Sequence, residues 1–166
     1  MNCKLFGEYA TLSYEELLNL LIEHKDIYLV TDTKTPNTED TIKIFNDMVK
    51  IAKEKDEKVL DRFIVQIYNE QMFETIMNIY PLKSVLYTLY ITNSLNKDIL
   101  NFCKKNEIKA VIMSEIRFSK EFVKSLAGIR VNVYVHTINS KTILEELKAK
   151  EVYEIYTDYL LPSEIG

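Results

Sequence analysis

The sequence is poor in glycine and histidine, and these shortages exclude several kinds of active site. It has three glycines, and neither G-x-G-x-x-G nor G-x-x-x-x-G-K-[ST] occurs in it. The two common phosphate-cradling loops are therefore absent, and nucleotide-binding folds of those kinds are not expected. His24 and His136 are the only histidines, which limits any mechanism that needs a pair of imidazoles.

Cysteine is also scarce. Cys3 and Cys103 are the two cysteines, and they are too few and too far apart for a disulfide framework or a cysteine-based metal cluster. Cys103 falls on the apolar stripe of a predicted helix, so we expect it to be a small residue of the core. Cysteine chemistry therefore gives no indication of function.

The chain has no basic block and no long apolar run. Its 21 lysines and arginines stand against 25 aspartates and glutamates, for a net charge of -4. A nucleic-acid partner is therefore not expected. No segment has the length and hydrophobicity of a signal peptide or of a membrane span, so we expect a cytoplasmic protein.

Six short apolar segments, each followed by polar residues and an amphipathic helical pattern, organise the 166-residue chain. This alternation is typical of a parallel α/β protein, and the length predicts one domain over 1–166. A helix with a capping box of Ser13 and Glu16 opens the series. The pattern alone allows both a (β/α)₈ barrel and a doubly wound sheet. We expect strands over 27–33, 62–67, 83–90, 109–114, 131–137 and 153–158.

Asp32 and Lys34 come at the end of the first predicted strand. Side chains two residues apart on a strand share a face, so both should leave the strand in the same direction. In parallel α/β folds the chemistry gathers beyond the carboxyl ends of the strands, which makes this pair a candidate site. On the residues alone, a turn or capping residue before Pro36 is the favoured interpretation of Asp32, and Lys34 could equally be a solvated lysine.

Other polar residues lie within or after the apolar strands. Gln66 is either a buried amide satisfied by a neighbour or a group directed at a ligand. His136 is a candidate site residue, although a lone histidine among apolar neighbours is more often structural. Asn139 and Asp158 are expected to stabilise loops. The strand tyrosines are expected to pack in the core and at its rim: Tyr87, Tyr90, Tyr134 and Tyr156.

Four stretches resemble strand motifs of the glycerophosphodiester phosphodiesterase family. Residues 62–67 are similar to its "V-Q-S-F" strand and residues 131–139 to its "V-x-V-W-T-V-N" strand. Residues 153–159, with Pro162, are similar to the "G-I-x-T-D-x-P" ending. Residues 29–34 resemble the "E-x-K" of the third strand. The four stretches occur in the family's order and at about its distances, and the resemblance covers nearly all of the chain from Thr11 onward.

This resemblance implies an incomplete TIM barrel of the PLC-like phosphodiesterase type, with six parallel βα units and without the first two. It places Asp32 as a ligand of a divalent metal, Ca²⁺ or Mg²⁺. Lys34 takes the place of the family's phosphate-binding lysine, and we assign Gln66 and His136 to substrate binding. The implied activity is hydrolysis of glycerophosphodiesters to an alcohol and glycerol phosphate.

The departures from the family concern its catalytic residues. The His-Arg pair of the first strand, the acidic residues of the second and a second catalytic histidine have no counterpart here. We therefore assign no catalytic residue and expect hydrolysis only if the missing strands are supplied. These strands could belong to an upstream segment or another chain, and the apolar sheet edges near Ile27 and Tyr153 would then be exposed.

Two alternatives remain open. One is an inactive relative that binds a phosphorylated ligand or regulates a partner protein, and that would close its sheet edges as a homodimer. The other is an unrelated six-unit α/β binding module, in which Asp32 and Lys34 would have no part in ligand binding.

Overall fold

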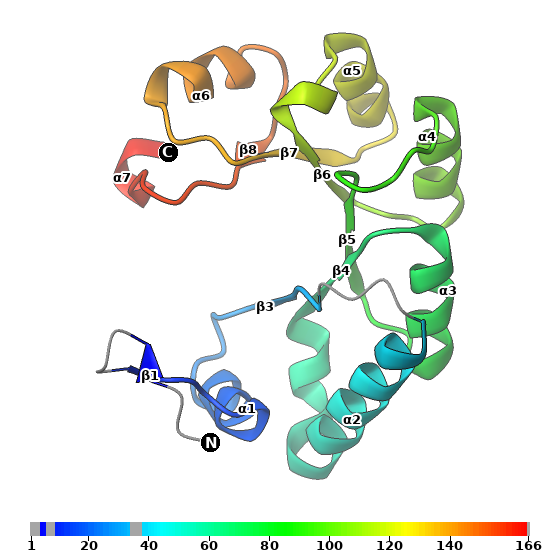
Figure 1. Ribbon diagram of the computed structural model, residues 1–166, viewed down its shortest axis with the longest axis vertical. Helices are drawn as coiled ribbons and strands as arrows, with labels where there is room; N and C mark the ends of the chain where they lie inside the picture. The colour runs from blue at the N-terminus through cyan, green and yellow to red at the C-terminus, as the bar shows by residue number, and fades with distance from the viewer. Residues whose placement is uncertain (1–3, 6–8, 34–37, 166) are drawn as a thin grey trace.

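The computed structural model describes residues 4–5, 9–33 and 38–165, and a parallel sheet of six strands forms its centre. The strands are neighbours in chain order, and Figure 1 shows them curled into an open half-barrel with helices on the outer side. The expected α/β fold, an incomplete TIM barrel of six parallel βα units, is confirmed. The strands are β3 (Leu29–Thr31), β4 (Phe63–Ile67), β5 (Ser84–Thr88), β6 (Ala110–Ser114), β7 (Asn132–His136) and β8 (Glu154–Ile155).

Helices connect and follow the strands, and a short antiparallel hairpin of β1 (Lys4–Leu5) and β2 (Tyr9–Ala10) precedes them. The sequence pattern does not predict this hairpin. The α-helices are α1 (Tyr14–Glu23), α2 (Thr38–Asp56), α3 (Glu70–Ile79), α4 (Asn96–Lys105), α5 (Lys120–Gly128), α6 (Lys141–Lys148) and α7 (Pro162–Ile165). Two 3₁₀ helices, η1 (Glu57–Arg62) and η2 (Glu115–Arg117), follow α2 and β6.

Alternation along β4 separates a buried outer face from a half-buried inner face. In β4, Phe63, Val65 and Ile67 are buried, whereas Ile64 and Gln66 are partly exposed. Successive side chains of a strand point to opposite faces of the sheet. The buried set therefore packs under the helices and forms the core, while the other set lines the concave side of the half-barrel.

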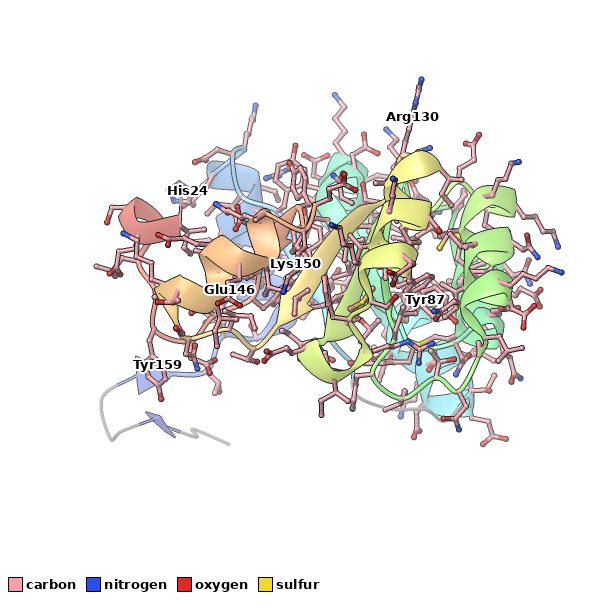
Figure 2. The ribbon with its side chains drawn as sticks, turned by 90° about the horizontal axis from the view of Figure 1, so that it is seen from above. His24, Tyr87, Arg130, Glu146, Lys150 and Tyr159 are labelled. Atoms are coloured by element: carbon pink, nitrogen blue, oxygen red, sulfur yellow. The ribbon has the colours of Figure 1, made fainter. Side chains whose placement is uncertain are left out.

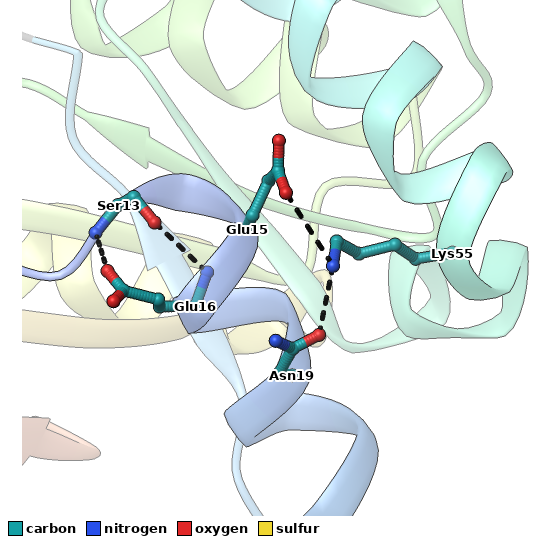
Figure 3. A network of polar contacts seen from close by, with 5 residues as sticks. All are labelled: Ser13, Glu15, Glu16, Asn19 and Lys55. Carbon is teal, nitrogen blue, oxygen red and sulfur yellow. Dashed lines mark hydrogen bonds and ion pairs between the residues drawn. The ribbon is translucent and has the colours of Figure 1, made fainter.

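The first helix begins at the predicted capping box and is tied to α2. Ser13 Oγ accepts from the Glu16 amide (3.2 Å), and the Ser13 amide donates to Glu16 Oε2 (2.7 Å). The hydrogen bond from the Ser13 backbone amide is the main cause that lowers the pKa of the Glu16 carboxyl group. Lys55 Nζ, from α2, donates to Asn19 Oδ1 (3.0 Å) and lies 3.8 Å from Glu15, as Figure 3 shows.

Arg62 fixes the end of α1 and the segment that leads into β3. Its Nη1 donates to the carbonyl oxygens of His24 (2.8 Å) and Ile27 (3.1 Å), and its Nη2 donates to that of Leu21. The last carbonyls of a helix have no partner within the helix. One guanidinium from the last residue of η1, just before β4, therefore holds the segment that leads into the neighbouring edge strand, β3.

Both edges of the sheet are open among the described residues. There β3 pairs with β4 and β8 pairs with β7, and Figure 1 shows the two edge strands apart from each other. Tyr28 is 60% exposed beside β3, and Tyr153 is 57% exposed beside β8. The expected exposed apolar edges are therefore confirmed.

A mainly apolar hollow of about 460 Å³ lies on the concave side. In a closed eight-stranded barrel, side chains from all the strands fill the interior. The six strands described here therefore fill only part of the space that corresponds to a barrel interior. Its lining residues are Val30, Ile64, Leu86, Ala110, Tyr134, Ile155, Tyr156 and Thr157.

Cys103 is buried in the core, as predicted, and burial raises the pKa of its thiol to about 12. Cys3 lies outside the described residues. Within the described part of the chain, no helix combines the length and the hydrophobicity that crossing a bilayer requires.

Candidate functional site

A cavity of about 350 Å³ opens at the carboxyl ends of the strands, on the concave side of the sheet. It extends from the end of β3 to the segment after β8, and its size is within the range of small-molecule sites. Figure 2 places His24 and Arg130, which precede β3 and β7, on the opposite side from Tyr159, which follows β8. The lining residues are Asp32, Gln66, Tyr68, Thr88, Tyr90, Ile112, His136, Thr137, Tyr156, Thr157 and Asp158.

Tyr68 connects two of the predicted site residues. Its hydroxyl donates to Asp32 Oδ1 and accepts from Gln66 Nε2 (3.0 Å). Burial, followed by the hydrogen bond to Asp32, raises the pKa of Tyr68. The phenol therefore stays protonated at neutral pH and holds the carboxylate of Asp32 at the end of β3.

Gln66 combines the two roles that the sequence left open. Its side chain is partly buried and has Tyr68 as a neighbour, and it also lines the cavity. Its backbone amide donates to Thr31 Oγ1 (3.3 Å), which links β4 to β3. The amide is thus both satisfied by the protein and available at the wall of the cavity.

His136 enters the cavity at the end of β7. Its ring meets that of Tyr90 edge-on, with 6.3 Å between the ring centroids. The Nε2 atom is buried and has no hydrogen-bond partner among the described residues, and the same is true of Thr88 Oγ1 at the end of β5. Burial lowers the pKa of His136, so the imidazole is neutral at pH 7.

The loops after β7 and β8 are joined by a small polar network. Asn139 Oδ1 accepts from Thr157 Oγ1 (3.1 Å) and from the Asp158 amide (2.9 Å), and Asn139 Nδ2 donates to Asp158 Oδ2 (3.3 Å). The predicted loop-stabilising role of Asn139 and Asp158 is confirmed. Asp158 additionally lines the cavity.

Of the four candidate residues from the sequence, the structure brings Asp32, Gln66 and His136 together in one cavity. Lys34 lies outside the described residues. The sequence interpretation missed Thr88 and Tyr68, and it assigned Tyr90 to packing alone. Alternation along the strands could have indicated them, because Thr88 and Tyr90 share a face and Tyr68 follows Gln66 by two residues.

The described residues do not by themselves fit a divalent metal. Ca²⁺ takes six to eight oxygen ligands, and Mg²⁺ requires near-octahedral coordination. No group of three or more His, Cys, Asp or Glu side chains among the described residues is placed to hold an ion. Asp32 can supply one carboxylate, so its role as a metal ligand stays a prediction that depends on further ligands.

The buried imidazole predicts a pH dependence of stability. The pKa of His136 is lowered in the folded state, whereas in the unfolded chain it is about 6.5. The unfolded state therefore takes up the proton first, and stability is lost as pH falls from about 6.5 through the folded-state pKa. We expect His136→Phe to lose less stability between pH 7 and pH 5 than the natural chain, as urea denaturation measures. Parallel pH curves for the two proteins would contradict this.

No family model matches this sequence, and no curated protein matches it either. Solved structures do resemble it. One is a glycerophosphodiester phosphodiesterase from Parabacteroides distasonis, with a TM-score of 0.74 and 18% identity over 98% of this chain and 66% of that chain. Another is an Oleispira antarctica phosphodiesterase in complex with the product sn-glycerol-3-phosphate. It has a TM-score of 0.64 and 13% identity over 87% of this chain and 56% of that chain.

These matches establish the fold. The chain spans 52 to 66% of the length of the similar solved structures. Its six parallel βα units match part of a barrel of the glycerophosphodiester phosphodiesterase type, in agreement with the resemblance of the strand motifs.

Proposed function

We propose that this chain binds a small phosphodiester in the cavity at the carboxyl ends of its strands. We further propose that it hydrolyses glycerophosphodiesters, to an alcohol and glycerol phosphate, once the strands that complete the barrel are supplied. The main support is the gathering of Asp32, Gln66 and His136 in one cavity, at the end of the sheet where barrel enzymes carry their sites. The product bound to the Oleispira antarctica relative is in keeping with a ligand of this size.

We assign the ligand contacts as follows. Lys34, which lies outside the described residues, would supply a positive charge for the phosphate, as its place in the strand motif implies. The Gln66 side-chain amide, which its hydrogen bond to Tyr68 holds in position, orients a ligand oxygen. The neutral imidazole of His136 has one nitrogen that can donate a hydrogen bond and one that can accept a hydrogen bond. Asp32 accepts from Tyr68 and forms part of the cavity wall at the end of β3.

The chain alone is expected to lack turnover. Cleavage of a phosphodiester needs two positioned titratable groups and stabilisation of the charge that develops on the phosphoryl oxygens. The described cavity holds one imidazole, and the Asp158 carboxylate already accepts a hydrogen bond from Asn139. The described residues therefore supply only one of the two members of a general acid and base pair.

A complementation assay tests this function. The chain is co-expressed with the part of the Parabacteroides distasonis enzyme that it does not match, and release of glycerol phosphate from glycerophosphodiesters is measured with Mg²⁺ or Ca²⁺. We expect no turnover above buffer from the chain alone and metal-dependent turnover from the assembled pair. Asp32→Asn should abolish the restored activity.

Two results would contradict the proposal. One is hydrolysis by the chain alone at the rate of the assembled pair. The other is an assembled pair that is stable but inactive and does not bind sn-glycerol 3-phosphate.

An inactive binding or regulatory module is the second candidate, because the described cavity holds a single imidazole. It predicts binding of sn-glycerol 3-phosphate by the chain alone without turnover in any assembly. Gel filtration tests the accompanying homodimer, since the open edges of β3 and β8 would be covered by a second copy. The cytoplasmic location stays a prediction, which fractionation of the producing cells tests.

A further inference from the structure

Four exposed apolar side chains lie on two neighbouring segments of the rim, at the carboxyl ends of β5 and β6. Their exposed fractions are 58% for Tyr90, 47% for Ile91, 71% for Leu95 and 98% for Ile116. The first three belong to the loop between β5 and α4, and Ile116 belongs to η2, which follows β6. We call these four residues the rim patch. Single exposed apolar residues are ordinary, whereas a group of them marks an interaction site.

One arginine joins the two segments of the rim patch. Arg117 Nη1 donates to the carbonyl oxygen of Thr92 (2.8 Å), and Nη2 donates to that of Ser94 (2.8 Å). Within the loop, Thr92 Oγ1 donates to Ser94 Oγ (3.0 Å) and accepts from the Ser94 amide (3.2 Å). Three of the four patch residues are chain neighbours of the residues in this network. The patch is therefore presented on one fixed support.

The rim patch is remote from the open edges of the sheet. The strands β5 and β6 are the two inner strands, and Figure 1 shows them across the half-barrel from the gap between β3 and β8. Strands that complete the barrel, or a second copy that covers the edges, would leave the patch exposed. The partner of the rim patch is therefore neither of these.

The rim patch has little charge around it. Residues 89–95 include no charged side chain. In η2, Glu115 is exposed, whereas Arg117 is half-buried and binds the loop carbonyls. Lys97 and Asp98, in the first turn of α4, have opposite charges. The patch is therefore suited to an apolar partner and not to a strongly charged one.

The opposite ends of the strands are charged instead. The turns that lead into β6, β7 and β8 each expose a charged side chain there: Glu107, Arg130 and Glu151. Figure 2 shows Arg130 on the opposite side from Tyr159, which follows β8 and is 77% exposed. This difference between the two ends of the strands favours one orientation of the molecule on an apolar layer.

The size and shape of the rim patch favour a lipid layer over a protein. A stable protein interface takes about 20 to 30 residues from each side and packs closely at its centre. The rim patch offers four residues, and Ile116 projects from its turn with almost no contact to the rest of the chain. Projecting apolar side chains can enter the edge of a bilayer without a complementary shape. Tyrosine suits that boundary, because its ring is apolar and its hydroxyl is polar.

We propose that the rim patch binds the surface of a lipid bilayer, with Ile91, Leu95 and Ile116 in the apolar layer and Tyr90 at its boundary. Burial of apolar side chains provides the attachment, so binding does not require anionic lipids. Tyr90 also lines the cavity, so the cavity would open near the lipid headgroups. This binding goes beyond the proposed function, because it needs neither turnover nor a ligand in the cavity.

A tryptophan at the tip of the rim patch tests the proposal. The chain has no tryptophan, so Ile116→Trp provides the only indole fluorescence. With phosphatidylcholine vesicles we expect a blue shift of the emission, and quenching by phosphatidylcholine that is brominated in its acyl chains. Tyr28→Trp is the matched control, since Tyr28 is 60% exposed and precedes β3, at the opposite end of the strands. Its emission should not change.

Cosedimentation with the same vesicles measures the strength of binding. Ile116→Ser should weaken partitioning to the vesicles about tenfold, because it removes apolar area that enters the bilayer. Tyr28→Ser should leave partitioning unchanged. Urea denaturation should show that Ile116→Ser keeps its stability, since the side chain is almost fully exposed. Neither about 0.5 M NaCl nor added phosphatidylglycerol should strengthen or abolish binding.

Four outcomes would overturn the proposal. The first is no binding to phosphatidylcholine vesicles, and the second is binding that requires phosphatidylglycerol. The third is equal blue shifts for the two tryptophan variants, because another surface would then enter the bilayer. The fourth is a blue shift of Ile116→Trp that grows with protein concentration without vesicles, because the patch would then bind a second copy. None of these measurements depends on release of glycerol phosphate, so failure of the proposed function is detected separately.

Discussion

Replacing Tyr68 with alanine should lower the free energy of unfolding by about 4 kcal/mol, the size typical of removing a buried aromatic side chain. Tyr68 is 4% exposed and belongs to the main core. Its ring also contacts that of Tyr90 edge-on, and its hydroxyl joins Asp32 to Gln66. The substitution therefore removes core packing and releases two residues of the cavity at once.

Tyr68→Phe separates these two effects. It keeps the ring and removes the hydroxyl, so we expect a loss of about 1 to 2 kcal/mol, the range for a hydrogen-bonded buried hydroxyl. Urea denaturation gives both free energies, and a titration with sn-glycerol 3-phosphate reports the effect on the site. Equal destabilisation by the two substitutions would contradict the assignment of Tyr68 to the core.

Replacing Arg62 with methionine should lower the free energy of unfolding by about 3 kcal/mol, because the charge-assisted hydrogen bonds that it removes are stronger than neutral ones. The guanidinium is the donor for the carbonyls of Leu21, His24 and Ile27, and methionine keeps much of the stem without a donor. A positive charge at the C-terminal end of a helix also interacts favourably with the helix dipole. Loss of this contact frees the segment between α1 and β3.

Arg130→Met is the matched control for this substitution. It makes the same chemical change at an exposed position, where a change within about 0.5 kcal/mol is typical. Chemical denaturation measures both variants, and hydrogen exchange at β3 locates the effect of Arg62→Met. If Arg62→Met lowers the free energy of unfolding no more than Arg130→Met does, hydrogen bonds from water to the three carbonyl oxygens would be as stabilising as those from Arg62.

The strands were predictable from the sequence because each is an apolar run with a helical pattern after it. Their ends were less predictable at the edges of the sheet. The first and last strands are expected over 27–33 and 153–158, whereas β3 covers Leu29–Thr31 and β8 covers Glu154–Ile155. An edge strand is hydrogen-bonded on one side only, so its ends are less strongly held in the extended form.

The site was predictable where a polar residue interrupts an apolar strand, as Gln66 and His136 do. Thr88 carries no such signal, since threonine is a common strand residue. That its hydroxyl has no partner among the described residues depends on the strands on either side of β5, β4 and β6, which no local pattern specifies. Tyr68 follows the last residue of β4, and its hydrogen bond to Asp32 joins residues from two different βα units.

The sequential strand order has a consequence for how the molecule folds. Every pair of neighbouring strands from β3 to β8 is also consecutive along the chain, and no pairing among the described residues joins the first strand to the last. Such an architecture approaches a one-dimensional array, in which stability comes from each unit and its contacts with the next. Folding can then start at an inner pair such as β5 and β6 and spread outward. The outer units, which carry Asp32 and Asp158, would be the last to become ordered and the first to fray.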